Sequence, residues 1–358
     1  MVTQNNQVVR LLIVRNDKLG DFMLAWPVFS LLKKHWPKLH ITVLVPPYTK
    51  TIAEFCPWVD DILLDEGEDA IALARQFKRQ PFDAMLTLFS TNRTAFSGWL
   101  SRIPYRLAPA TKFAQFFYTN RLTQRRSRSE KPEYAYNIDL AYQLLADFGK
   151  LEPRKTTVDK LGDFLPAEIC RPLLRPTSEQ QRSHFAKTRQ LDEDALWIAL
   201  HPGSGGSANN LSAQQYVQLA CEIHCTKSLV FIITAGPGEE GAAEQVAHEI
   251  RRGGGTAVAQ ASGKINLLIA TLQWADLFIS NSTGPLHIAA ALDRPTAAFY
   301  PRHRSATPLR WQTLNAPHKR LAFTPPPEGV AEDVSAIDVT AAASTISEFL
   351  VSLIDRVR

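Results

Sequence analysis

The acidic residue Asp21 begins an amphipathic segment at residues 21–35, which follows an apolar run at residues 8–14. A carboxylate at the start of a helix is commonly a cap, which is worth about 1 kcal/mol. At the carboxyl end of a strand the same group can instead act as a general base on a bound ligand. Position alone favours the cap. Lys18, in the same turn, either binds an anionic substrate or is a solvated loop lysine.

A glycine-rich loop at residues 201–210, His-Pro-Gly-Ser-Gly-Gly-Ser-Ala-Asn-Asn, follows a later apolar run. Backbone N–H groups, here those of Ser204 and Gly205, can wrap phosphate oxygens, and a following helix adds its positive end. The loop also fits the pattern G-x-G-x-x-A, but no ribose-binding acid ends the next strand at Thr234. We therefore predict a phosphate-binding loop and no nicotinamide site.

Two further turns lead from a strand into a helix. Glu239 falls in the first helical turn after residues 229–234, where an acid suits the helix dipole and could equally accept hydrogen bonds from a ribose. Ser282, Thr283 and Gly284 precede a small-residue helix and form a second candidate anion site at a helix N-terminus. His287 lies in that helix's first turn, either as a structural histidine or as part of the anion site.

Several reaction classes are disfavoured by missing motifs. The chain has no G-x-x-x-x-G-K-[ST], no H-E-x-x-H, no D-x-D near a strand end and no G-x-S-x-G at a nucleophile elbow. We therefore expect no metal ion and no cofactor. Two anion sites in the second half and a carboxylate in the first half favour transfer from a nucleotide-diphosphate donor.

Short apolar runs alternate with amphipathic segments in both halves of the 358 residues. Strands are predicted at residues 8–14, 41–45, 61–64, 84–89, 196–200, 229–234, 257–259, 277–280 and 296–300, and helices at 21–35, 68–79, 134–148, 212–224, 239–251, 265–273, 285–292 and 340–357. This alternation predicts an α/β fold with two doubly wound, Rossmann-like parallel sheets facing a cleft. The predicted domains are residues 1–170, which bind the acceptor, and 171–339, which bind the donor. A final helix lies within residues 340–358, and the Pro-rich stretch 149–194 is predicted to be the linker.

No apolar run approaches the roughly 20 residues of a membrane-spanning helix. The four cysteines form no disulfide framework, so we expect a cytoplasmic protein.

Residues 93–131 carry nine Lys and Arg and one acid, a net charge of +8, whereas the whole chain carries +5. Aromatic residues are interleaved with these cations. The composition fits a solvated basic loop, a nucleic-acid surface, or a site for an anionic amphiphile at a membrane surface. Its place within a two-domain enzyme pattern favours an acceptor site, for which Arg93, Arg106 and Lys112 are candidates, and makes nucleic acid the weaker interpretation.

In this order, the motifs resemble the ADP-heptose:lipopolysaccharide heptosyltransferases, glycosyltransferase family 9. The resemblance covers most of the chain and rests on Leu19-Gly-Asp21, Trp26-Pro27, His201-Pro-Gly-Ser-Gly205, the turn at residues 236–240, Asn281-Ser-Thr-Gly-Pro-Leu-His-Ile-Ala-Ala-Ala291 and Pro308-Leu-Arg-Trp311. It implies a GT-B fold whose last helix returns to the N-terminal domain. It also implies inverting, metal-independent transfer from a nucleotide-sugar, ADP-heptose, to the lipid A–core glycolipid at the inner membrane surface.

By the same resemblance Asp21 is the general base, and Ser204, Gly205, Thr283 and Gly284 stabilise the ADP leaving group. The chain departs from the family pattern at Asn209-Asn210, where a Lys or Arg is common, and at Ser282, where Asp is common. These departures leave open another nucleotide-sugar donor or a low-activity paralogue. The basic segment at residues 93–131 leaves open a non-enzymatic nucleic-acid-binding protein.

Overall fold

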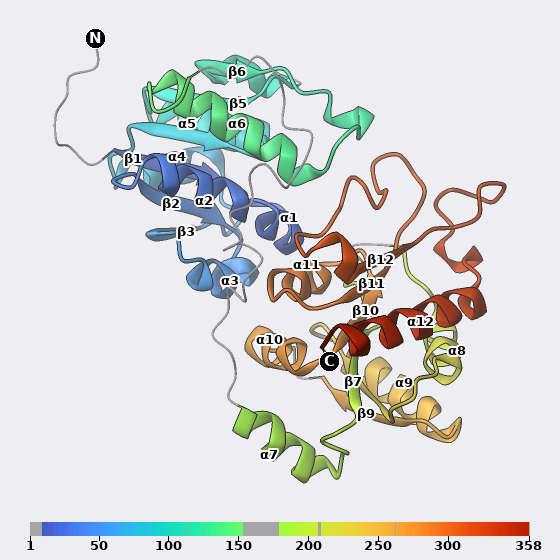
Figure 1. Cartoon of the computed structure of the whole chain (residues 1–358). Coiled ribbons are helices and arrows are strands. Elements are labelled where there is room, and N and C mark those ends of the chain that lie inside the picture. Colours follow the sequence, from blue (N-terminus) through green and yellow to red (C-terminus); the bar gives the residue numbers. More distant parts are fainter. Residues whose placement is uncertain (1–8, 112, 153–178, 207–208, 262, 358) are drawn as a thin grey trace. The chain divides into compact units, whose positions relative to one another are not determined.

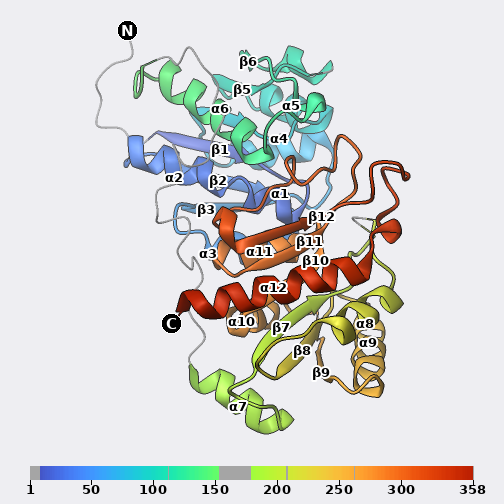
Figure 2. The same cartoon turned by 45° about the vertical axis from the view of Figure 1, so that its right-hand side comes forward.

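The computed structural model describes residues 9–111, 113–152, 179–206, 209–261 and 263–357. The chain divides into two units, Met1–Ile169 and Cys170–Arg358. Each unit is built around a parallel sheet covered by helices (Figures 1 and 2).

The first unit holds a sheet of six described strands in the order β3-β2-β1-β4-β5-β6. Its elements are β1 (Arg10–Val14), α1 (Leu19–Met23), α2 (Trp26–His35), β2 (His40–Val45), η1 (Pro47–Thr49), α3 (Lys50–Phe55), β3 (Asp61–Leu64), α4 (Ala70–Lys78), β4 (Ala84–Thr87), α5 (Asn92–Leu100), β5 (Tyr105–Pro109), η2 (Phe113–Phe117), β6 (Asn120–Leu122), η3 (Arg126–Arg128) and α6 (Glu133–Asp147). Helices α2 and α6 pack together, as do α4 and α5. The strand order reverses between β1 and β4, the point at which doubly wound sheets bind ligands.

The second unit repeats this order: read from its other edge, its described strands run β9-β8-β7-β10-β11-β12. Its elements are α7 (Glu179–Arg189), β7 (Leu196–His201), α8 (Ala213–Glu222), β8 (Leu229–Thr234), α9 (Glu240–Arg252), β9 (Thr256–Gln260), α10 (Ile265–Trp274), β10 (Leu277–Asn281), α11 (Gly284–Ala291), β11 (Thr296–Phe299), η5 (Pro317–Lys319), β12 (Arg320–Phe323), η6 (Val334–Ala336) and α12 (Val339–Val357). The strands are parallel throughout, for example Ile198 beside Leu277 and Phe231.

The predicted helix at residues 21–35 is two helices, α1 and α2. Pro27 lies in the first turn of α2, where its missing N–H group costs nothing, and the chain turns at Leu24 and Ala25. Part of the predicted linker is also helical, because α7 lies within it. This helix is highly polar, and its residues Phe185 and Ala186 pack against Trp197. Residues 153–178 of that linker lie outside the described residues.

The last helix, α12, packs within the second unit, and its predicted return to the N-terminal domain stays a prediction. The buried side chains of α12, among them Ala342, Ile346 and Leu350, belong to the same core as Tyr216 and Leu219 of α8. Its apolar face is therefore used within the second unit, and α12 is part of that unit rather than a separate element.

Candidate functional site

The loop after β1 places Asp21 in the first turn of α1. The N-cap position of α1 is occupied by Lys18, so Asp21 does not cap this helix. Its side chain is buried and accepts a hydrogen bond from the Arg15 guanidinium. Burial raises the pKa of Asp21 above its usual value, and the neighbouring Arg15 opposes that rise. The carboxylate is thus a stronger base than an exposed aspartate.

Arg15 is itself buried and holds three carboxylates. Besides Asp21, its Nε lies 3.0 Å from Asp17 Oδ1 and its Nη1 lies 3.1 Å from Glu133 Oε1. Burial alone would lower the pKa of Arg15, but these three acids raise it, so the guanidinium stays charged. Burial also raises the pKa of Asp17, against the attraction of Arg15. At both Asp17 and Asp21, burial outweighs the attraction of Arg15, which would lower the pKa.

A second arginine completes this network. Arg126 Nη1 donates to Glu133 Oε1 at 2.7 Å and to the Leu88 carbonyl at 3.1 Å, and Arg15 Nη1 also donates to Leu88 O at 3.4 Å. The loop after β1, the end of β4 and the start of α6 are therefore joined at the carboxyl edge of the sheet. The five charged groups carry a net charge of −1 when all are ionised, and the site of Asp21 is polar and rigidly held.

The second unit has an uncharged site at its own switch point, the start of α11 after β10, the strand that corresponds to β4 of the first unit. Thr283 is the N-cap residue of α11, yet its side chain makes no capping hydrogen bond. Thr283 Oγ1 and His287 Nδ1 are both buried and have no hydrogen-bond partner among the described residues. Burial lowers the pKa of His287 to about 4, so the ring is neutral near pH 7. Because buried polar atoms are rarely left unpaired, this pair at a helix N-terminus is available to a ligand, and its predicted role as an anion site stays a prediction.

The glycine-rich loop after β7 binds an internal carboxylate. Glu239 Oε1 accepts the N–H groups of Ser204 (3.1 Å) and Gly205 (2.8 Å), and Oε2 accepts that of Gly236 (3.1 Å). A Cβ atom at Gly203 would lie 2.0 Å from Glu239 Oε2, so a larger residue there would displace the Glu239 carboxylate. Burial alone would raise the pKa of Glu239, but these N–H groups lower it. The N–H groups of Ser204 and Gly205 thus hold the Glu239 carboxylate, and their predicted contact with a phosphate stays a prediction.

Two of the predicted acceptor-binding cations have structural partners. Arg93 donates to Asp65 Oδ2 at 2.5 Å and to the Glu68 carbonyl at 3.0 Å, which joins α5 to the loop after β3. Arg106 donates to the carbonyl oxygens of Phe117 and Ile103. Both guanidinium groups therefore hold loops together. Lys18 is exposed, and Ser282 is half-buried next to Thr283.

Lys112, the third predicted acceptor contact from the basic segment, lies outside the described residues.

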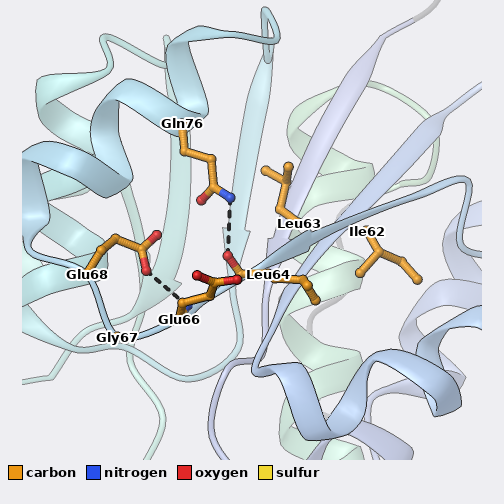
Figure 3. A pocket seen from close by; sticks show the side chains of 7 residues that line it. All are labelled: Ile62, Leu63, Leu64, Glu66, Gly67, Glu68 and Gln76. Atoms are coloured by element: carbon orange, nitrogen blue, oxygen red, sulfur yellow. Dashed lines mark hydrogen bonds between the residues drawn. The ribbon is translucent and has the colours of Figure 1, made fainter.

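A hollow of about 630 Å³ lies beside the end of β3 and is lined by residues 62–64, residues 66–68 and Gln76 (Figure 3). Glu66 and Glu68 contribute carboxylates there, and the Glu66 N–H donates to Glu68 Oε2 at 3.0 Å. An acidic hollow at an outer strand does not suit an anionic donor or acceptor.

Sequence reasoning missed the partners of Asp21. A signal was present: Arg15 ends a buried strand, where an unpaired cation is not tolerated, and Asp17 follows in the same loop. Glu133 and Arg126 gave no such signal, because their approach to Arg15 depends on the path of the chain after β6. In the described residues no cluster of three or more metal-ligating side chains occurs.

Two Rossmann-type units, each with a six-stranded parallel sheet of the same order in the described residues, form the architecture of GT-B glycosyltransferases. The sequence pattern of glycosyltransferase family 9 (heptosyltransferase) matches residues 70–321, and the chain belongs to this family, as its motifs predict. It is 39% identical to a Haemophilus influenzae protein that carries the provisional name of glycosyltransferase, over 95% of this chain and 96% of the relative. It is 25% identical to the lipooligosaccharide heptosyltransferase 2 of Haemophilus ducreyi, over 84% and 86%.

Among solved structures, the Escherichia coli ADP-heptose lipopolysaccharide heptosyltransferase II matches with a TM-score of 0.71. The two are 17% identical, and the match covers 96% of this chain and 99% of the other. At this identity the likeness shows the fold alone. It confirms the predicted α/β, GT-B-type architecture.

Proposed function

We propose that this protein is an inverting heptosyltransferase that moves a heptose from ADP-heptose to the inner core of lipopolysaccharide. Membership of family 9 and relatives named as heptosyltransferases support this specificity. The observation that carries the proposal is the buried pair Thr283 and His287 at the start of α11, whose unpaired polar atoms suit the diphosphate of a nucleotide-sugar.

Asp21 is the proposed general base. It takes the proton of the acceptor hydroxyl while that oxygen bonds to the anomeric carbon of the donor. The bond from this carbon to the ADP oxygen breaks, ADP leaves with the electron pair, and the configuration at carbon inverts. The transition state resembles an oxocarbenium ion, as in other glycosyl transfer. Arg15 remains charged throughout and holds the Asp21 carboxylate in place.

The donor is assigned to the second unit. Thr283, His287 and the Gly284 N–H face the negative charge that grows on the leaving ADP, with Ser282 beside them, and no metal ion is assigned a role. Ser204 and Gly205 hold Glu239, and Glu239 retains lone pairs that accept hydrogen bonds from the ribose hydroxyls.

The proposed acceptor is an anionic glycolipid, the lipid A–core, at the inner face of the cytoplasmic membrane. Lys18 is the proposed acceptor contact beside Asp21. In the described residues no helix is long and apolar enough to cross a membrane. On this proposal the enzyme reaches its acceptor from the cytoplasm.

The test is a thermal-shift panel of nucleotide-sugars followed by a transfer assay. ADP-heptose at 100 times its Kd should stabilise the protein by roughly 2.7 kcal/mol, and a UDP-sugar should not. The same donor should then yield ADP and a heptosylated core acceptor. Stabilisation by a different nucleotide-sugar would reassign the donor, a result that the departures at Asn209-Asn210 and Ser282 make worth testing. Steep, salt-dependent DNA binding with no response to any nucleotide-sugar would replace the enzyme by a nucleic-acid-binding protein.

A further inference from the structure

Five aromatic rings form a continuous cluster on α5 and η2 of the first unit. Neighbouring ring centroids are 5.4–6.0 Å apart, and the members are Phe96, Trp99, Phe113, Phe116 and Phe117. Three of them are strongly exposed: Trp99 by 49%, Phe113 by 63% and Phe116 by 67%. We call this set the aromatic patch. A contiguous exposed apolar surface of this kind usually marks an interaction site.

The packing of α5 explains why these rings point outward. The buried face of α5 carries small residues, among them Ser97 and Gly98. A Cβ atom at Gly98 would lie 2.5 Å from Met85 Sδ, so the helix lies as close to β4 as glycine permits. Ser97 Oγ donates to the Ala70 carbonyl at 2.9 Å, which fixes α5 against α4. The bulky residues are therefore held on the outer face by the fold.

Exposed cations accompany the patch. The Arg102 N–H donates to the Trp99 carbonyl at 3.0 Å, so Arg102 is directly beside the patch, and Arg121 on the edge strand β6 is four residues beyond Phe117. Both side chains are exposed and form no ion pair with a described acid. The one acid of residues 93–131, Glu130, lies 3.6 Å from Arg128.

The charge of residues 93–131 thus separates into two groups. Internal partners hold Arg93, Arg106, Arg126 and Lys131. The exposed cations are Arg102, Arg121, Arg125 and Arg128. Of the exposed group, Arg102 contacts the aromatic patch, and Arg121 lies on β6, the strand that follows η2.

We propose that the aromatic patch, together with Arg102 beside it and Arg121 on the following strand β6, docks this enzyme on an anionic lipid bilayer. Aromatic rings favour the membrane–water interface because one part of that environment is apolar and the other wet. Arginines beside them pair with lipid phosphates. Such docking would hold the first unit at the surface that carries a glycolipid acceptor. The purpose of this docking, access to a glycolipid acceptor, rests on the proposed function. Vesicle binding itself needs no catalysis.

Vesicle co-sedimentation tests the proposal with the full chain. Wild-type protein should bind vesicles containing phosphatidylglycerol better than vesicles of phosphatidylcholine alone, and added salt should weaken this binding. The triple variant Trp99→Ala, Phe113→Ala, Phe116→Ala should lose at least about tenfold in partitioning, because three exposed rings are removed. The matched control, Leu309→Ala with Val330→Ala, removes exposed apolar side chains of the second unit and should bind like wild type.

A charge variant guards against altered ring packing. Arg102→Gln with Arg121→Gln leaves the rings in place and should reduce binding to anionic vesicles by about fivefold for each arginine. Binding by the triple variant equal to wild type would overturn the proposal. So would a wild-type dimer that the triple variant converts to a monomer with vesicle binding unchanged, since a second copy would then cover the patch.

Transfer to a delipidated, water-soluble core acceptor separates the two proposals. The triple variant should retain this activity and lose activity on the vesicle-embedded acceptor, which supports docking. Intact vesicle binding by a protein that transfers no sugar to any acceptor would remove the proposed function and leave the docking surface standing.

Discussion

The two units share one strand order but prepare opposite kinds of site at its switch point. In the first unit, the loop after β1 and the end of β4 border a network of five charged groups, one of which is Arg15. In the second, the start of α11 after β10, the counterpart of β4, holds Thr283 and a neutral His287. The scaffold therefore supplies only the place, and the loop residues decide what that place binds.

The two sites differ in whether their buried polar groups have partners within the protein. Asp21 is paired with a cation and shielded, so it can change its protonation without leaving its position. Thr283 and His287 are left unpaired, which costs stability unless a ligand completes their hydrogen bonds. One site thus suits proton transfer and the other suits capture of an anion.

Asp21→Asn carries the largest expected effect, because it removes the one group in the charged site assigned to proton transfer. We expect kcat to fall by about 10²–10⁴-fold with the Kd for the donor unchanged, since the donor is assigned to the second unit. Steady-state kinetics and donor calorimetry on the same preparation measure both quantities. Wild-type turnover in this variant would remove Asp21 from its role.

Asp17→Asn is the matched control, since Asp17 contacts the same guanidinium. It should cost much less than Asp21→Asn. If kcat falls further in Asp17→Asn than in Asp21→Asn, then Asp17 rather than Asp21 is the base.

Thr283→Val tests the unpaired group of the neutral site. Valine has the shape of threonine, and the lost hydroxyl has no partner to leave behind, so the free energy of unfolding should rise by about 1 kcal/mol. The donor Kd should weaken by about tenfold, because the ligand loses a hydrogen bond. Urea unfolding and donor calorimetry measure the two effects.

Thr271→Val provides the contrast. Thr271 is equally buried in the same unit, but its Oγ1 donates to the Leu267 carbonyl at 2.9 Å. This variant should lose stability and keep its donor Kd. If Thr283→Val also loses stability, its hydroxyl has a structural partner, and the comparison between the two sites weakens.

The alternation of apolar runs and amphipathic segments was enough to predict two doubly wound sheets. It missed α5, β5 and β6, because the outer face of α5 carries aromatic residues that reverse the usual pattern of a surface helix. It also missed β12, a short edge strand whose residues are only partly buried. In both cases tertiary contacts, rather than local pattern, determine the element.

The site was predictable where backbone geometry carries the chemistry and less so where side chains meet across loops. Thr283 and His287 follow from a helix start after a strand. Glu239 was a candidate, but its place in the cradle of Ser204 and Gly205 depends on how the loops after β7 and β8 approach each other. The spacing of residues within one loop does not show which other loop it contacts.

The pH dependence of stability is the smallest effect and the one that separates the two sites by sign. Burial lowers the pKa of His287 to about 4, against about 6.5 in an unfolded chain. Between these values the unfolded state binds more protons, so this histidine removes stability as the pH falls. Asp21 behaves in the opposite way: its pKa is raised on folding, so its contribution to stability grows as the pH falls.

His287→Gln should therefore flatten the loss of stability on acidification. From pH 7.5 to 5.5 the wild-type histidine should cost about 1 kcal/mol of unfolding free energy, and the variant should be spared this cost. Urea unfolding at the two pH values gives the difference directly, whatever the substitution does to absolute stability. His248→Gln, at an exposed position of α9, is the matched control and should keep the wild-type slope. Equal slopes for wild type and His287→Gln would mean that His287 is not held neutral, and the second site would then carry a charge of its own before any anion binds.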